Sequence, residues 1–125
     1  MAVGADDTVY ATDYTANKVY RVFEGGKTLL AGDGSLAEVD GTGGAASFKR
    51  PRGIAVDTAG NVFVADEGGP TIRRITPAGV VKTLSPGITL TKPRGLAFAP
   101  DGYLAVVDNG ADTIWKVPPW MTMAP

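Results

Sequence analysis

The feature that most constrains this chain is an internal repeat. Residues 51–56, Pro-Arg-Gly-Ile-Ala-Val, recur as residues 93–98, Pro-Arg-Gly-Leu-Ala-Phe, at a spacing of 42 residues. The same spacing places the segment 60–66 on 102–108, so that both copies end in an aspartate. A period of this length indicates one small structural unit used repeatedly, each copy burying its apolar surface against its neighbours.

A third copy lies upstream at a spacing of 53 residues. The segment 8–13, Thr-Val-Tyr-Ala-Thr-Asp, matches 61–66, and even Ala2-Val3 falls on Ala55-Val56. The additional residues lie mostly in a glycine-rich stretch between the first two copies. We therefore expect a loop insertion at that point, including the segment 41–46, whose G-x-G-x-x-A spelling belongs to no strand–helix unit and is interpreted as loop.

Each copy has the pattern of four short strands. In the second copy the stretch 62–65 is apolar at both alternating sets of positions, which indicates a strand buried on both faces. Strand 72–75 has charges between its apolar residues, so we expect it to lie closer to solvent. Turn residues such as Asp57 and Gly60 separate the strands, and 80–84 supplies a fourth. The strands are predicted to run in order from the inside of the assembly to the outside.

Composition excludes several classes of function. The 125 residues include no cysteine and no histidine, which removes disulfides, thiolate zinc sites and histidine-based acid–base chemistry. The net charge of −1 gives no long-range attraction to nucleic acid or to an anionic membrane. No apolar stretch approaches the length needed to span a bilayer, and the first residues do not have the pattern of a secretory signal.

The unit Pro-x-Gly-Ile-Ala-Val-Asp-x-x-Gly-Asn-Val-Phe-Val-Ala-Asp closely resembles the NHL repeat, and the insertion 40–48 looks like that family's inter-blade loop. The resemblance covers nearly the whole chain. It implies an all-β fold of three four-stranded antiparallel β-propeller blades within a single segment, 1–125. The expected boundaries are blade 1 at about 1–32, the loop at 33–50, blade 2 at about 51–92 and blade 3 at about 93–125.

Three blades do not close a ring, because propellers typically have four to eight. We expect two copies to associate head to tail as a homodimer, giving a six-bladed ring; the alternative is that the chain is a piece of a longer propeller. The terminal faces should carry apolar residues of the kind that pack between blades. The candidates for the dimer interface are Val3, Trp120, Met121 and Met123; the tail that holds the last three departs from the repeat, and its alternative is a frayed end.

Strand geometry gathers charged residues on one face of the disc. The candidate ligand-binding residues are Arg52, Arg94, Asp13, Asp66, Asp108 and Asn109. One interpretation is a ring of alternating charges around the channel mouth that binds a polar or anionic ligand. The other, which we favour for the aspartates, is structural: each strand-end carboxylate accepts backbone N–H bonds, and an arginine from a neighbouring blade pairs with it.

The favoured function is a non-catalytic binding or scaffold module that uses this face, with a protein or a small polar ligand as its partner. The resemblance to NHL propellers does not by itself decide between binding and catalysis. The alternative is a metal-dependent hydrolase or lactonase similar in architecture to gluconolactonase-like propellers, which hold a divalent ion on carboxylate and amide oxygens. Calcium would then be its cofactor, with Asp13, Asp66, Asp108 and Asn109 as possible oxygen donors; under the favoured function we expect no cofactor and no catalytic or metal-binding residue.

Overall fold

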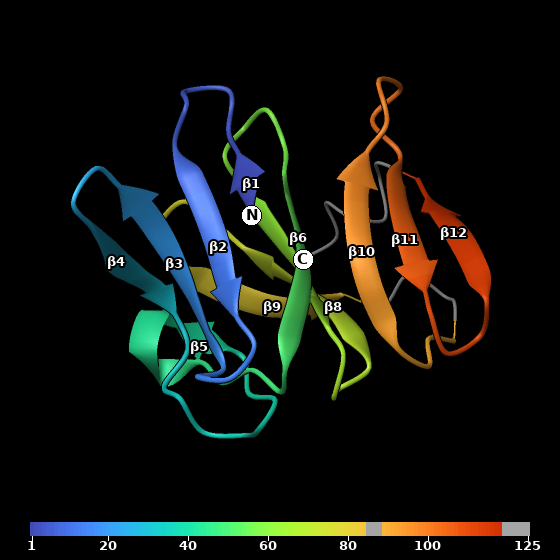
Figure 1. Ribbon diagram of the computed structural model, residues 1–125, viewed down its shortest axis with the longest axis horizontal. Helices are drawn as coiled ribbons and strands as arrows, with labels where there is room; N and C mark the ends of the chain where they lie inside the picture. The colour runs from blue at the N-terminus through green and yellow to red at the C-terminus, as the bar shows by residue number, and fades with distance from the viewer. Residues whose placement is uncertain (85–88, 119–125) are drawn as a thin grey trace.

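Each repeat forms one antiparallel sheet. The computed structural model describes residues 1–84 and 89–118, and in this part of the chain three sheets lie side by side (Figure 1). Every strand pair within them is antiparallel. The expected all-β fold of consecutive propeller blades is therefore confirmed. No helix in the described ranges is long and apolar enough to cross a membrane.

Blade 1 is a four-stranded sheet in the order β1-β2-β3-β4. Its strands are β1 (Ala2–Val3), β2 (Val9–Asp13), β3 (Lys18–Phe23) and β4 (Gly26–Ala31). The short β1 pairs with β2 just as the first strand of blade 2 pairs with the second. Ala2 and Val3, which the repeat aligns with Ala55 and Val56, thus form the innermost strand of blade 1.

Blade 2 has one strand more than the repeat predicts. The four expected strands are β6 (Pro51–Val56), β7 (Val62–Asp66), β8 (Thr71–Ile75) and β9 (Val80–Leu84). A fifth, β5 (Gly41–Thr42), comes from the insertion and pairs with the outer edge of β9. A single 3-10 turn, Gly43–Ala45, follows it. The expectation of plain loop at 41–46 is corrected, because the free edge of β9 offers backbone partners that the insertion uses.

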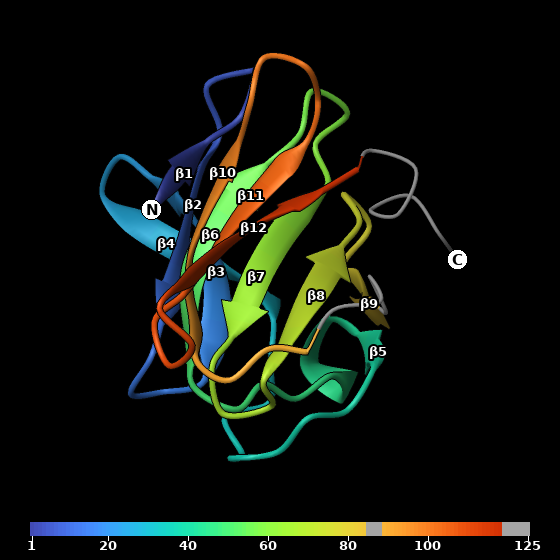
Figure 2. The same ribbon diagram turned by 90° about the vertical axis from the view of Figure 1, so that its right-hand side faces the viewer.

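Blade 3 contains β10 (Pro93–Phe98), β11 (Leu104–Asp108) and β12 (Thr113–Val117) among the described residues. Three of the proposed interface residues, Trp120, Met121 and Met123, lie outside the described residues. Strand β10 packs beside β6 and β7 of blade 2 (Figure 2). The fit is closest at Gly53, where a β-carbon would collide with the carbonyl oxygen of Arg94, so that only glycine lets β6 and β10 approach this closely.

The core consists of two layers, one at each junction between blades. Between blades 1 and 2, Tyr10 and Val19 pack against Val62, Val64 and Ile75. Between blades 2 and 3 lies a second cluster, whose members include Phe63, Ala65, Ile72, Leu104, Val106 and Val117. Strand β7 contributes to both layers and is buried along its whole length, as its doubly apolar pattern predicts. Burying each of its large side chains contributes about 1.5–3 kcal/mol, which makes β7 the centre of the fold.

Candidate functional site

Strand ends collect the charged candidates on one side of the molecule. The register pairs Pro51 with Asp66 and Pro93 with Asp108, so the starts of the innermost strands lie beside the ends of the second strands. Strand β2 also ends at this side, the lower edge of Figure 1. Arg52 and Arg94, one residue into β6 and β10, therefore share a face with the strand-end aspartates.

The three strand-end aspartates bind backbone N–H groups rather than one another. Asp13 Oδ1 accepts hydrogen bonds from the amides of Thr15 and Ala16 at 3.1 and 2.9 Å. Asp108 accepts from Thr91 and Lys92, each at 2.8 Å. Asp66 Oδ1 accepts from Lys49 at 2.8 Å. The structural interpretation of these aspartates matches the geometry: each fixes the chain that enters or leaves its own blade.

The strand-end aspartates of blades 2 and 3 have pKa values shifted in opposite directions. Burial raises the pKa of Asp66 to about 6, outweighing the Lys49 amide and the charge of Arg73 that lower it. Burial also opposes ionisation of Asp108, but there the backbone N–H groups of Lys92 and Thr91 prevail and its pKa is lowered. The number of aligned N–H donors thus decides which form each buried carboxyl prefers.

Arg73 on β8 corrects the expectation that this strand lies near solvent. Its side chain has no exposed surface. The guanidinium donates from Nη1 to Ser47 O at 2.8 Å and to Asp66 Oδ2 at 3.1 Å, and from Nη2 to Val39 O and Asp40 Oδ1, both at 3.0 Å. A buried charge requires this degree of pairing. The arginine that pairs with Asp66 thus comes from the same blade, not from a neighbouring one as predicted.

The buried guanidinium also anchors the insertion. It lies 4.8 Å from the centre of the Phe48 ring, which is itself fully buried. Asp40 then continues the network to β9, accepting from the Thr83 hydroxyl at 2.8 Å. Burial disfavours the Asp40 carboxylate, yet the bonds from Thr83 and Arg73 lower its pKa overall. The network joins the insertion, β7, β8 and β9, and its role is structural.

Arg52 and Arg94 converge instead on Glu67, the residue that follows the strand-end aspartate of blade 2. Arg94 Nε donates to Glu67 Oε2 at 2.7 Å, and Arg52 Nε forms an ion pair with the same oxygen at 2.8 Å. The side chains of Arg52 and Arg94 remain 35% and 38% exposed, whereas Glu67 is only 11% exposed. Two partly exposed positive charges therefore face one negative charge that is nearly buried.

An aromatic side chain from blade 1 completes this cluster. The guanidinium carbon of Arg52 lies 4.1 Å from the centre of the Tyr14 ring. Tyr14 occupies the repeat position of Glu67, and in blade 3 the same position is the exposed Asn109. This is the position at which the three blades differ most on the charged face. Comparing the three residues that follow the aspartates would have indicated Glu67, which our sequence reasoning missed because it treated the blades as alike.

The proposed oxygen donors for a metal do not form a cluster. Within residues 1–84 and 89–118, no group of three acidic side chains could hold a metal ion. Asp13, Asp66 and Asp108 each serve a separate blade through the backbone bonds described above. The alternative based on calcium therefore stays a prediction.

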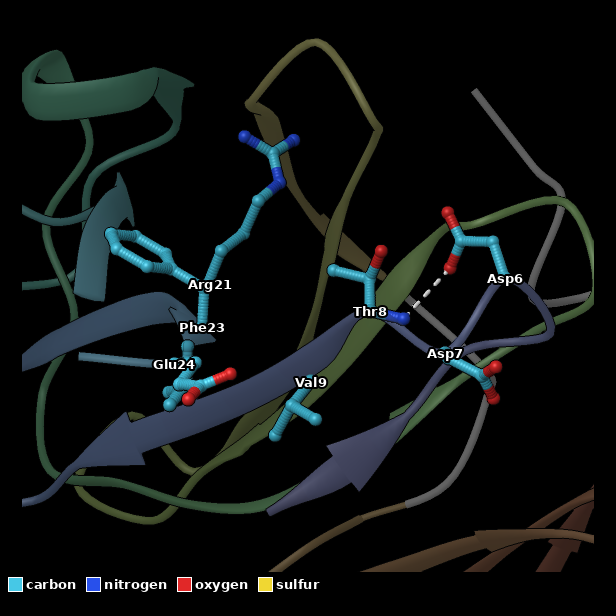
Figure 3. Close-up of a pocket in the computed structure, with 8 residues that line it drawn as sticks. Asp6, Asp7, Thr8, Val9, Arg21, Phe23 and Glu24 are labelled. Carbon is cyan, nitrogen blue, oxygen red and sulfur yellow. Dashed lines mark hydrogen bonds between the residues drawn. The ribbon is translucent and has the colours of Figure 1, made fainter. Parts of the chain in front are cut away.

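A surface hollow lies at the opposite end of blade 1 from the strand-end aspartate. A hollow of about 470 Å³ opens between the β1–β2 and β3–β4 turns (Figure 3). Its rim is acidic, with Asp6, Asp7 and Glu24, and Phe23 and Val22 form its apolar side. The arginine on its wall, Arg21, donates from Nη2 to the carbonyl of Pro77 at 2.6 Å. One donor of Arg21 is thus bound to the β8–β9 turn, and the hollow lies far along the strands from the Arg52–Glu67–Arg94 cluster.

Consecutive antiparallel blades, packed face to face around β7 and held at one end by strand-end aspartates, define a segment of an NHL-type β-propeller. A family model for the Teneurin NHL domain matches residues 17–88, more than half of the chain. The chain belongs to the Teneurin NHL domain family. No curated protein sequence is significantly similar to it.

Solved structures with the same fold have diverse descriptions. A structural genomics protein of unknown function from Bacteroides thetaiotaomicron is 22% identical, with a TM-score of 0.79, over 89% of this chain and 32% of its own. An auxiliary nutrient binding protein from Bacteroides ovatus is 18% identical, with a TM-score of 0.73, over 84% and 33%. A putative gluconolactonase is 19% identical, with a TM-score of 0.69, over 91% and 42%. The chain spans between about a third and two fifths of these structures, and the similarity shows the fold.

Proposed function

We propose that this chain is a non-catalytic binding module that takes a carboxylate-bearing ligand on the face formed by Arg52, Glu67 and Arg94. The observation that carries the proposal is the shared Oε2 atom of Glu67, which holds two guanidinium groups side by side. Arginine suits this role because its planar fork matches the two oxygens of a carboxylate. The excess of one positive charge, partly open to solvent, is left for the ligand.

The positions of the three residues support binding rather than catalysis. Arg52 comes from β6 of blade 2 and Arg94 from β10 of blade 3, so the cluster bridges these two blades. Tyr14 adds a flat aromatic surface from blade 1. A rigid set of donors on a disc face serves recognition, either of a small molecule or of an acidic group on a protein.

Calorimetric titration with citrate at low ionic strength tests the proposal. We expect binding by the unmodified chain and a loss of affinity of roughly 10-fold or more in Arg94→Gln, because a hydrogen bond to a charged group contributes about 1.5 kcal/mol or more. Glu67→Gln should bind citrate more tightly, since it removes the competing carboxylate. Lys82→Gln, which makes the same charge change on the exposed outer part of β9, is the matched control and should leave affinity unchanged.

The two variants separate the proposal from a purely structural cluster. If Arg52, Glu67 and Arg94 serve only to join blades 2 and 3, both variants lower stability and neither changes citrate affinity selectively. Equal affinity in Arg94→Gln, Lys82→Gln and the unmodified chain would refute the binding role. The metal-dependent alternative is tested separately by titration with calcium, for which no arrangement of the described residues provides a specific argument.

A further inference from the structure

The two end blades each leave one apolar face without a neighbour. On blade 1 this face carries Val3, Val9, Ala11, Val22 and Leu29, which share one side of the sheet by the pairing register, together with Tyr20 and Lys27, which contact each other. On blade 3 it carries Ala97, Ala105, Val107 and Ile114, with Lys116 at its side. We call these surfaces the front face of blade 1 and the back face of blade 3. Neither is covered by the described residues of the chain.

Both faces match faces that are buried inside the molecule. Ile114 is 72% exposed, whereas its repeat equivalent in blade 2, Ile72, is 1% exposed because blade 3 covers it. Val107 is 41% exposed and its equivalent, Ala65, is not exposed at all. On the other side, Val22 is 37% exposed and its equivalent, Ile75, is fully buried against blade 1.

The matching has a definite direction. At the junction of blades 1 and 2, a back face meets a front face, and the same happens at the junction of blades 2 and 3. The uncovered back face of blade 3 therefore fits the uncovered front face of blade 1. The three blades of these 125 residues do not close a ring by themselves, since propellers typically have four to eight. Exposed apolar surfaces of this kind mark sites of association.

We propose that a second copy of this chain covers both faces, so that two copies close one ring of six blades. The back face of blade 3 in each copy packs on the front face of blade 1 in the other, which repeats the internal junction twice around a two-fold axis. Two is also the one number of copies that gives a total between four and eight blades. Contacts of this head-to-tail type form closed rings when the rotation closes.

The hollow of blade 1 lies beside the front face of that blade. Val9 and Val22 line the apolar side of the hollow near Asp6 and Phe23, so in the ring the hollow would border the junction between the copies. The apolar residues of the two faces are Val, Leu, Ile and Ala, and the phenylalanines of blades 2 and 3 are used inside. Phe63 and Phe98 pack edge to face at 5.2 Å between ring centres.

Sedimentation velocity or light scattering of the 125-residue chain at 10–100 μM tests the proposal. We expect the mass of two copies. Ile114→Asp on the back face and Val22→Asp on the front face should each raise the dissociation constant at least 100-fold, because each places an unpaired charge in both junctions. Thr58→Asp, in the exposed β6–β7 turn, is the control and should remain dimeric. Circular dichroism establishes that the variants keep their sheets.

Mixing the two variants distinguishes this arrangement from others. An equimolar mixture of Ile114→Asp and Val22→Asp retains one intact front face and one intact back face, so head-to-tail association predicts a heterodimer held by one unaltered junction. A dimer that joins two back faces would resist Val22→Asp, and mixing the two variants would not restore dimers that contain Ile114→Asp. A monomer at 100 μM, a mass of three copies, or a dimer insensitive to either substitution overturns the proposal.

Discussion

Replacing Arg73 with methionine should strongly destabilise the fold. The substitution keeps an unbranched, flexible side chain over Phe48 but removes the guanidinium, and with it four hydrogen bonds of 2.8–3.1 Å. Asp66 would lose its cation while remaining buried, and the carbonyls of Ser47 and Val39 would lose their donors. Removing one partner of a buried ion pair costs about 3–5 kcal/mol, a large share of the 5–15 kcal/mol that holds a typical domain together.

The cost should depend on pH in a defined direction. Without Arg73, the pKa of Asp66 should rise above its present value of about 6, so the variant binds a proton up to higher pH than the unmodified protein does. Between pH 6 and 7.5 the folded variant keeps this proton whereas the unmodified protein has lost it. The destabilisation by Arg73→Met should therefore be about 2 kcal/mol smaller at pH 5 than at pH 7.5, at 1.36 kcal/mol per pH unit.

Urea denaturation at one protein concentration, followed by circular dichroism, measures both effects. The double variant Arg73→Met/Asp66→Asn should be more stable at pH 7.5 than the sum of the two single changes predicts, by at least about 1 kcal/mol, because it leaves no unpaired charge. A cost below about 1 kcal/mol for Arg73→Met, or the same cost at pH 5 and pH 7.5, would show that the buried pair does not stabilise the blade in the way we describe.

Three further perturbations follow from the same contacts, with urea denaturation as the measurement. In the unmodified protein, stability should decrease by on the order of 2–3 kcal/mol as pH rises from about 4 to about 6, because the raised pKa of Asp66 makes the folded state bind its proton more tightly than the unfolded chain; a flat profile in this range contradicts the assignment. Gly53→Ala should cost about 1–3 kcal/mol because the new methyl group meets the Arg94 carbonyl, whereas Gly44→Ala, which meets nothing within 4 Å, should change stability by less than about 0.5 kcal/mol. Asp108→Asn should cost about 1–3 kcal/mol, since one amide oxygen cannot serve the two backbone N–H groups that the two carboxylate oxygens bind; unchanged stability would mean that water replaces the lost acceptor.

The repeat was enough to predict the blades, because local patterns determine them. The doubly apolar stretch 62–65 became β7, buried on both faces, and the strand-end aspartates accept backbone amides as their position before a turn suggests. These features depend on residues close together in the sequence or on the fixed period. The pairing of β1 (Ala2–Val3) with β2 shows how far that period extends.

The charged network was not predictable in the same way. Arg73 and Arg74 stand together between Ile72 and Ile75, a pattern typical of a strand near solvent, and the groups that bury Arg73 are supplied by the insertion, some 30 residues earlier in the chain. The repeat comparison could have singled out Glu67 but not its partners, because its two arginines lie on two different blades and reach the same oxygen only when the blades pack. Pairings that depend on packing between distant segments leave no local pattern.

Strand β5 gives the two junctions of the molecule unequal mechanical strength. The insertion that leaves blade 1 crosses to the far edge of blade 2, pairs there with β9, and is bonded to Thr83 through Asp40. Blade 1 is thus joined to blade 2 by the backbone pairing of the insertion with β9 as well as by side-chain packing. If the 125 residues were pulled from both ends, we expect the junction between blades 2 and 3 to separate first, while blades 1 and 2 stay together.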